Sequence, residues 1–305
     1  MYETLGLDMD PRTASVWFGV ALGMAFGILA QITRFCLRRA LIGPEAERAE
    51  ARGVWAMALV AALIGTQLAV ATGWISFADH RFHAASVPIF GLVVGGLLFG
   101  VGTVLARGCL SRLTVIGASG NLRAIVAVLV AAIVAHATLQ GVLAPVRSTL
   151  ASVTVPLGSL PGAPLIWAGA LGLVALVVAL RSGARPVLLV GAALLGALVP
   201  FGWVGTGFVL FDEFDPIALD SLAFSGPWAE SLFYGVASSV TTPRFGVGLI
   251  GGVLAGGCTV GAGLSGLPTL GVSAWIAFGA IVLGIVLTHA LQNRRIGGQV
   301  LIPAE

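Results

Sequence analysis

The chain has 305 residues, of which 58% are hydrophobic and 10% are charged, whereas a soluble domain has about 45–50% and about 25%. This composition and the mean hydropathy of +1.03 exclude an ordinary water-soluble protein and predict an all-α polytopic membrane protein. The net charge is +3, but no basic run with interleaved aromatic residues is present, so nucleic acid is excluded as a partner.

Apolar stretches long enough to cross a bilayer recur along the whole chain, since about 20 helical residues span a hydrocarbon core of about 30 Å. We expect a single transmembrane domain over residues 1–305, with repeat-like halves of roughly 1–150 and 160–305. It should contain about nine transmembrane helices and some short re-entrant helices. The nine expected spans are 15–33, 54–74, 87–106, 124–144, 164–180, 186–208, 228–242, 245–257 and 272–292.

The sixteen basic residues are all arginine, and their distribution predicts the orientation of the chain. Short cytoplasmic loops retain arginine, whereas translocated loops are poor in it. With nine spans and the N-terminus outside, thirteen of the sixteen arginines fall on the cytoplasmic side. The sequence therefore predicts a multi-pass membrane protein with its N-terminus outside, its C-terminus in the cytoplasm and lipid around its spans.

Glycine is abundant, with 43 residues, and much of it lies in stripes with a spacing of four. Such stripes line one helix face with small residues and let two helix backbones approach closely. We interpret them as packing surfaces, within one subunit or between two copies. The stripes are Gly19-Gly23-Gly27, Gly91-Gly95, Gly96-Gly100 and Gly248-Gly252-Gly256.

All three cysteines end a repeated element, which starts with Phe-Gly and continues as a glycine-rich apolar run. The elements cover residues 18–36, 90–109 and 245–258. The first two also match around the thiol, where Arg34-Phe35-Cys36-Leu37 corresponds to Arg107-Gly108-Cys109-Leu110. Because the cysteines are far apart and no CxxC pair exists, the sequence predicts no disulfide framework.

The chain loses its helical pattern after each cysteine. Residues 256–268 hold five glycines and a proline, and 107–121 is a second re-entrant candidate. At membrane depth, irregular backbone is tolerated only where it is buried in protein or lines a cavity, and broken helices commonly form the binding sites of transporters. The free amides of such breaks attract anions, and neutral thiols add soft, weak hydrogen-bonding groups. We therefore expect an anion site.

Two other features favour simpler interpretations. The cluster Asp79-His80-Arg81-Phe82-His83 is a conceivable metal site, but we interpret it as a solvated outer loop and expect no metal. Tryptophans near the span ends are expected in the interfacial belt; they are Trp17, Trp55, Trp74, Trp167 and Trp228.

The motifs around the three cysteines resemble those of the YeeE/YedE sulfur-transport family. They are Arg34-Phe35-Cys36, Arg107-Gly108-Cys109, and residues 256–263 followed by Ser265-Gly266. The resemblance implies an hourglass-shaped inner-membrane bundle that imports thiosulfate, with the three cysteines along a central path. It also implies a separate cytoplasmic sulfur carrier of the TusA type as a partner. A histidine common near the third motif is missing here, so other sulfur or selenium compounds remain alternative substrates.

The expected substrate-binding residues combine the three thiols with nearby polar and glycine residues. They are Cys36, Cys109, Cys258, Arg107, Asn121, Thr259, Gly257, Gly261 and Ser265. We expect a transporter without cofactor and not an enzyme, and the absence of a Walker motif argues against ATP use by this chain. A membrane thiol oxidoreductase and a soft-metal transporter are the rival interpretations. The small number of methionines, four, counts against the second.

Overall fold

The structure is a computed structural model and describes residues 11–156, 164–211, 217–237 and 258–299. These residues are largely helical. The α-helices are α1 (Pro11–Thr33), α2 (Leu37–Ile42), α3 (Glu45–Ala71), α4 (Ile89–Leu105), α5 (Leu110–Ala118), α6 (Leu122–Leu139), α7 (Ala144–Ser152), α8 (Pro164–Arg181), α9 (Pro186–Val204), α10 (Ser225–Ala237) and α11 (Val272–Gln299).

Short elements of other kinds lie between these helices. Two 3₁₀ turns are η2 (Arg81–His83) and η6 (Leu267–Thr269), and two π-helical segments are η3 (Gly205–Val209) and η5 (Thr259–Gly266). The two-residue strands β1 (Ser86–Val87) and β2 (Val155–Pro156) pair antiparallel. The short helices and turns connect the long helices and carry the residues discussed below.

Seven helical segments of the described chain are long and apolar enough to cross a membrane. They match seven of the nine expected spans and confirm an all-α polytopic membrane protein. The expected span 228–242 overlaps α10, of which 13 residues are described, and its last five residues lie outside the described part of the chain. The expected span 245–257 lies outside the described residues. A total of nine spans therefore stays a prediction, as does the division into two halves.

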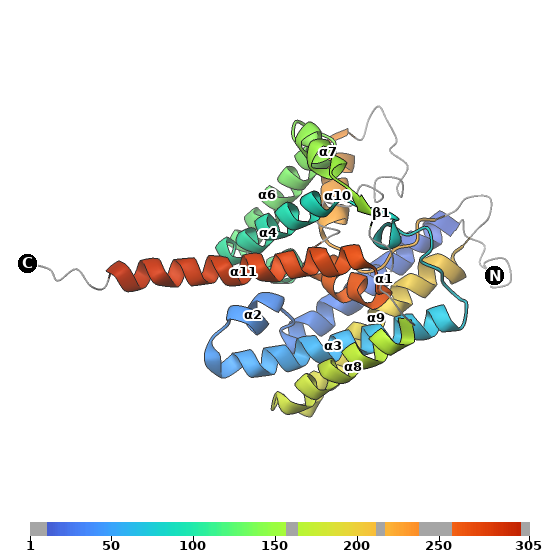
Figure 1. Cartoon of the computed structure of the whole chain (residues 1–305), viewed down its shortest axis with the longest axis horizontal. Coiled ribbons are helices and arrows are strands. Elements are labelled where there is room, and N and C mark those ends of the chain that lie inside the picture. The colour runs from blue at the N-terminus through green and yellow to red at the C-terminus, as the bar shows by residue number, and fades with distance from the viewer. Residues whose placement is uncertain (1–10, 157–163, 212–216, 238–257, 300–305) are drawn as a thin grey trace, which may run out of the picture.

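Helix α3 is central to the packing (Figure 1), with α2, α8 and α9 against it. It begins at Glu45, nine residues before the expected span, because Glu45 and Glu47 in its first turn favour the positive end of the helix dipole. The contact with α9 is very close, since a Cβ at Gly196 would overlap the carbonyl group of Ala58. Small residues thus allow the bundle to pack backbone against backbone.

Helices α4 and α11 form the second close pair. A Cβ added at Gly100 would lie 2.5 Å from the Ile281 carbonyl oxygen and 2.8 Å from the Gly284 Cα. This confirms a packing role for the Gly96-Gly100 stripe. By contrast, nothing lies within 4 Å of a Cβ added at any glycine of the Gly19-Gly23-Gly27 stripe, so that stripe faces no neighbour within the described chain.

The arginines are unevenly distributed over the folded chain, so the bundle has two different faces. One, named here the arginine-rich face, comprises α2, the α4–α5 and α8–α9 connections and the C-terminal part of α11 (Figure 1). The opposite face carries the loop 72–88, which contains η2, and residues 205–211 and 217–222, which follow α9. The chain alternates between these faces from one long helix to the next.

The interfacial interpretation of the tryptophans is wrong for Trp55. This side chain is only 8% exposed and stacks between Phe35 and Phe278, with ring centroids 6.1 and 5.2 Å away. Because α3 begins earlier than expected, Trp55 lies well inside a helix and not at its end. Trp17 and Trp74 are 63% and 49% exposed, as an interfacial position requires.

We predict that Gly100→Ala lowers the melting temperature of the purified protein in detergent, by an amount equivalent to about 1–3 kcal/mol, because the added methyl group forces α4 and α11 apart. Gly102→Ala is the matched control, since nothing lies within 4 Å of a Cβ at that position on the same helix. Equal melting temperatures for the two variants would contradict the close α4–α11 packing.

Candidate functional site

The two helices that lead into Cys36 and Cys109 end in the same way. In each, an arginine follows the last turn with a left-handed backbone, Arg34 with φ 51° and Arg107 with φ 59°. The amide of the next residue then bonds to the carbonyl five positions earlier, at 3.1 Å in both cases. This is a Schellman motif, in which glycine is usual at the left-handed position. The similarity of the two sequences therefore reflects one shared backbone geometry.

Each cysteine stands immediately before the short helix that follows it. Cys36 precedes α2, Cys109 precedes α5 and Cys258 precedes η5, all with extended backbone and φ of −165°, −74° and −76°. The first amides of a helix have no partner within it. No capping hydrogen bond reaches any of the three sulfurs, but the amides two and three residues after Cys36 and Cys258 lie near them.

The three cysteines, far apart in the sequence, converge inside the bundle. The Cys36 and Cys109 thiols interact directly, and Cys109 also reaches Thr259, which is adjacent to Cys258. Their exposed fractions are 9%, 2% and 0%, and all three are free thiols. A continuous set of buried sulfur and hydroxyl groups therefore connects the breaks after α1, after α4 and before η5.

Other polar groups complete this cluster. The Ser111 hydroxyl lies 3.3 Å from the Cys109 sulfur, and the backbone of Phe224 lies near the sulfur of Cys258. Gly261 contributes one of the amides near Cys258. Neither Ser111 nor Phe224 was among the substrate-binding residues expected from the sequence. The first was detectable as a hydroxyl two residues after a motif cysteine, whereas nothing in the sequence connects Phe224 with Cys258.

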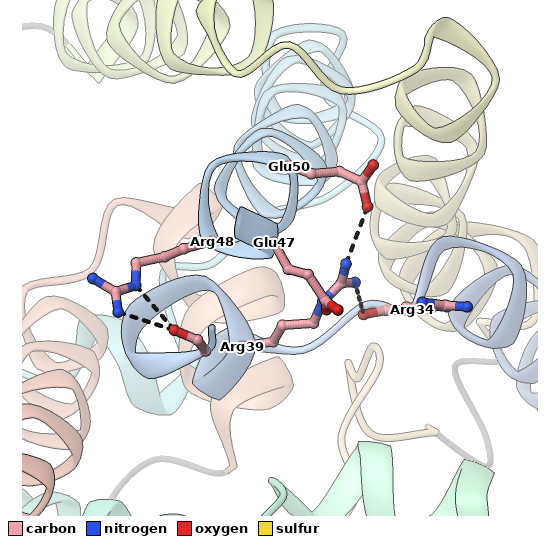
Figure 2. A network of polar contacts seen from close by, with 6 residues as sticks. Arg34, Arg39, Glu47, Arg48 and Glu50 are labelled. Carbon is pink, nitrogen blue, oxygen red and sulfur yellow. Dashed lines mark hydrogen bonds and ion pairs between the residues drawn. The ribbon is translucent and has the colours of Figure 1, made fainter. Parts of the chain in front are cut away.

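An arginine clasp, made of Arg39, Glu47 and Glu50, holds the helix that follows Cys36 (Figure 2). Arg39 Nε donates to Glu47 Oε2 at 2.9 Å, and Nη2 donates to Glu50 Oε1 at 3.0 Å. Its Nη1 reaches the carbonyl oxygen of Arg34 at 3.5 Å. The clasp ties α2 to the first turns of α3 and to the left-handed turn of Arg34, so it fixes the start of α2 where Cys36 lies.

Some of the expected site residues have other contacts. The Asn121 side chain accepts a hydrogen bond from the Ala124 amide at 3.1 Å and caps α6. The Ser265 hydroxyl donates to the Leu222 carbonyl oxygen at 2.8 Å. Arg107 is exposed on the arginine-rich face. The structure thus brings Thr259 and Gly261 to the cysteines. The Asn121 and Ser265 side chains are engaged in other hydrogen bonds, the Arg107 side chain is exposed, and Gly257 lies outside the described residues.

Comparison with known proteins assigns the chain to a family. A profile described as sulphur transport matches residues 32–188 and 245–287, which include all three cysteines. The chain belongs to the sulphur transport family. The chain is similar to the thiosulfate transporter TsuA of Spirochaeta thermophila, with 26% identity over 325 aligned residues. The alignment covers 88% of this chain and 96% of that protein.

The loop 79–83 of this sulphur transport protein is not the solvated loop expected from the sequence. Phe82 is 3% exposed, and the His80 ring packs edge-on against Trp203 with centroids 5.2 Å apart. The interpretation was wrong because it followed the charged residues of the loop, whereas the buried Phe82 among them anchors the loop to the bundle. No group of three metal-binding side chains occurs in the described parts of the chain.

We predict that Arg39→Ala lowers the free energy of unfolding by about 1–2 kcal/mol, because two carboxylates and one carbonyl group lose their partner. Glu47→Gln should cost less, since Arg39 keeps Glu50. Thermal unfolding of the two variants and of the Glu47→Gln/Glu50→Gln double variant measures this order. A double variant as stable as the wild type would contradict the clasp.

Proposed function

We propose that this member of the sulphur transport family imports thiosulfate across the bacterial inner membrane and passes it along its three cysteines. The observation that carries the proposal is the convergence of three buried free thiols at three helix breaks. The likeness to a thiosulfate transporter over most of both chains supports thiosulfate as the substrate. The family and this relative are also the reason for proposing a transporter and not an enzyme.

The chemistry of the cluster suits a small sulfur anion. A thiol is a weak donor and a weak acceptor, so it binds a sulfur atom or oxygen atom of thiosulfate without holding it tightly. Conduction needs several such weak sites, because an ion that binds too strongly does not leave. Thr259 and Ser111 add hydroxyl donors to the Cys109 sulfur environment. Unpaired amides at the helix starts contribute partial positive charge.

The order of the three thiols follows from the two faces of the bundle. Cys36 directly follows the end of α1 at the arginine-rich face, and Cys258 lies within electrostatic range of Arg81 on the loop of the opposite face. The excess of arginine makes the first face cytoplasmic by the positive-inside rule. The anion then passes from Cys258 to Cys109 and on to Cys36, with the N-terminus outside and the C-terminus in the cytoplasm.

Import of a dianion is opposed by the membrane potential. Moving one charge through 100 mV costs about 2.3 kcal/mol, so a dianion costs about 4.6 kcal/mol. Consumption of the anion on the cytoplasmic side offsets this cost by keeping its concentration low. A sulfur carrier of the TusA type is the proposed consumer, and the arginine-rich face is where the anion would leave the protein.

The two arginines with left-handed backbone, Arg34 and Arg107, lie where the anion would leave the thiols in our proposal. A side chain in that conformation costs about 1–2 kcal/mol, and such strain is concentrated at functional positions. Arg107 bears that strain where glycine would bear none, and it leads directly into Cys109. We propose that Arg107 draws the anion away from the thiols. Asn121, Gly257, Gly261 and Ser265 have supporting roles in the shape of the helix breaks.

We predict that Cys109→Ala and Cys258→Ala reduce initial uptake of ³⁵S-thiosulfate at least about tenfold in a bacterium that lacks its own sulfate and thiosulfate uptake. The matching Cys→Ser variants keep a hydroxyl donor but lose the polarisable sulfur, so we expect them to retain part of the activity. Wild-type rates in all the alanine variants would remove the thiol path. Failure of the wild type itself to restore growth on thiosulfate would remove the substrate.

A thiol oxidoreductase is the second candidate, because the Cys36 and Cys109 thiols interact. Redox exchange would require both sulfurs, whereas hydrogen-bond transfer tolerates serine to some degree. Uptake of thiosulfate labelled in its outer or its inner sulfur separates the two, since intact transport delivers both labels equally. Competition by sulfite, selenate and selenite defines the range of substrates.

We predict that Arg107→Gly raises the melting temperature and lowers the uptake rate, because glycine removes the left-handed strain together with the charge. Arg107→Lys, which keeps both the charge and a side chain, is the control and should change stability little. Unchanged uptake in the glycine variant would show that Arg107 only terminates α4.

A further inference from the structure

A cavity of about 610 Å³ opens on the face opposite the arginine-rich face. Its lining includes Asp79, His80 and Arg81 from the loop after α3, and Asp220 from the segment after α9. In the orientation proposed above, this cavity faces the outside of the cell. None of these residues was assigned a role by the sequence motifs, yet Arg81 and Asp220 line one cavity, and Arg81 lies within electrostatic range of Cys258.

The position of Arg81 is fixed by its neighbour Phe82. The Phe82 carbonyl oxygen accepts a hydrogen bond from the Ser273 hydroxyl at 2.9 Å, at the start of α11. On the other side, His83 Nε2 lies 2.8 Å from the carbonyl oxygen of Thr269 in η6. The turn η2 is thus attached to the segment that follows Cys258. Because the anchor and Cys258 belong to the same packed unit, Arg81 keeps a constant position relative to that thiol.

The Arg81 guanidinium has unused hydrogen-bonding capacity. Its Nε is buried and has no hydrogen-bond partner among the described residues, and its Cζ lies 5.0 Å from the centre of the Phe82 ring. The guanidinium is within electrostatic range of the Asp220 carboxylate and of the Cys258 sulfur, but no ion pair with Asp220 forms. Because Arg81 lines the cavity and forms no ion pair with a described residue, its guanidinium is available to an anion with several oxygen atoms.

Asp220 is held opposite by its own backbone. Its amide donates to the Thr206 hydroxyl oxygen at 3.1 Å, and that hydroxyl donates to the Asp220 carbonyl oxygen at 2.8 Å. The pKa of the Asp220 carboxyl is raised to about 7. Burial is the largest cause, the charge of Arg81 opposes it, and the charge of Glu230 adds to the increase. The carboxyl therefore changes charge near neutral pH.

We propose that Arg81 receives the anion in this cavity and that Asp220, which lines the same cavity, weakens anion binding when it is ionised and permits it when it is protonated. The inference rests on the proposed function and adds a binding step before Cys258. When the anion binds while Asp220 is ionised, the carboxylate takes one proton from a hydronium ion of the external solution, which becomes water. One O–H bond forms on the carboxyl, one proton is taken up with the anion, and no electrons are transferred. The ligand class is a small oxyanion of charge −2.

The sign of the pH effect follows from competition for one guanidinium. Below about pH 7 Asp220 is neutral, so it neither competes for Arg81 nor repels the anion. Above that pH the carboxylate does both. Anion affinity is therefore high at pH 6 and falls as the pH rises through 7, and the neutral fraction changes from about nine tenths at pH 6 to about one tenth at pH 8.

His80, the ionisable ring that lines the same cavity, does not produce this effect. Burial lowers the pKa of His80 to about 3, with smaller contributions from Arg81 and His83, so the ring is neutral throughout the range. Asp79 lines the same cavity but is exposed, and Glu230 acts from α10. His83 lines a neighbouring cavity of about 580 Å³. The acids Asp212, Glu213 and Asp215 lie outside the described residues.

The test measures the KM for ³⁵S-thiosulfate uptake into cells at external pH 6, 7 and 8. For the wild type we expect the KM to fall about tenfold from pH 8 to pH 6. Asp220→Asn should have a low KM at every pH, because asparagine mimics the neutral acid. Asp79→Asn is the matched control and should keep the wild-type profile. Arg81→Gln should raise the KM at every pH, and Arg81→Lys should raise it less.

A pH-independent wild-type KM, or an Asp220→Asn profile equal to that of the wild type, would overturn this inference while uptake itself remains. Absence of wild-type uptake at every pH would instead overturn the proposed function. Melting temperatures of the purified variants identify any that fail to fold. If Arg81→Gln is unstable, the Asp220→Asn profile decides, because that substitution changes neither the size nor the backbone contacts of the residue.

Discussion

Backbone polar groups inside a bilayer must find partners within the protein, and this constraint determines where the cysteines of this chain lie. Each helix break exposes amide and carbonyl groups that lipid cannot satisfy. Schellman motifs satisfy the carbonyl groups at the ends of α1 and α4. The amides at the start of the next helix remain available, and a thiol stands beside them in each case. A break that would be costly in lipid thus becomes a polar point inside a dense, glycine-rich bundle.

Three features could be predicted from the sequence. They are the membrane class, seven of the spans, and the fact that the cysteine motifs share one repeated pattern. Span positions follow from runs of apolar residues, which are local properties. The match between Arg34 and Arg107 indicated a shared structure, and the left-handed backbone at both positions explains it. The backbone after Cys258 was predictable only in part: its glycines argue against a regular α-helix, but the structure has the π-helical segment η5 there and not irregular backbone.

Contacts between distant segments could not be predicted. The hydroxyl of Ser265 is occupied by Leu222, and the side chain of Asn121 by the start of its own helix, so neither position follows from polarity alone. Arg81 and Asp220 line the same cavity because Phe82 anchors one loop and Thr206 holds the other. In sequence, both residues look like ordinary loop charges. Burial, which changes their chemistry, is a property of the folded chain.

The shared helix-end geometry has a consequence for the history of the chain. Everything needed to present one thiol, namely the left-handed arginine, the extended cysteine and the short helix behind it, is encoded within about ten neighbouring residues around Cys36, and again around Cys109. Such a compact cassette is portable. Segments outside these cassettes can differ in length without disturbing how the sulfur atoms are displayed.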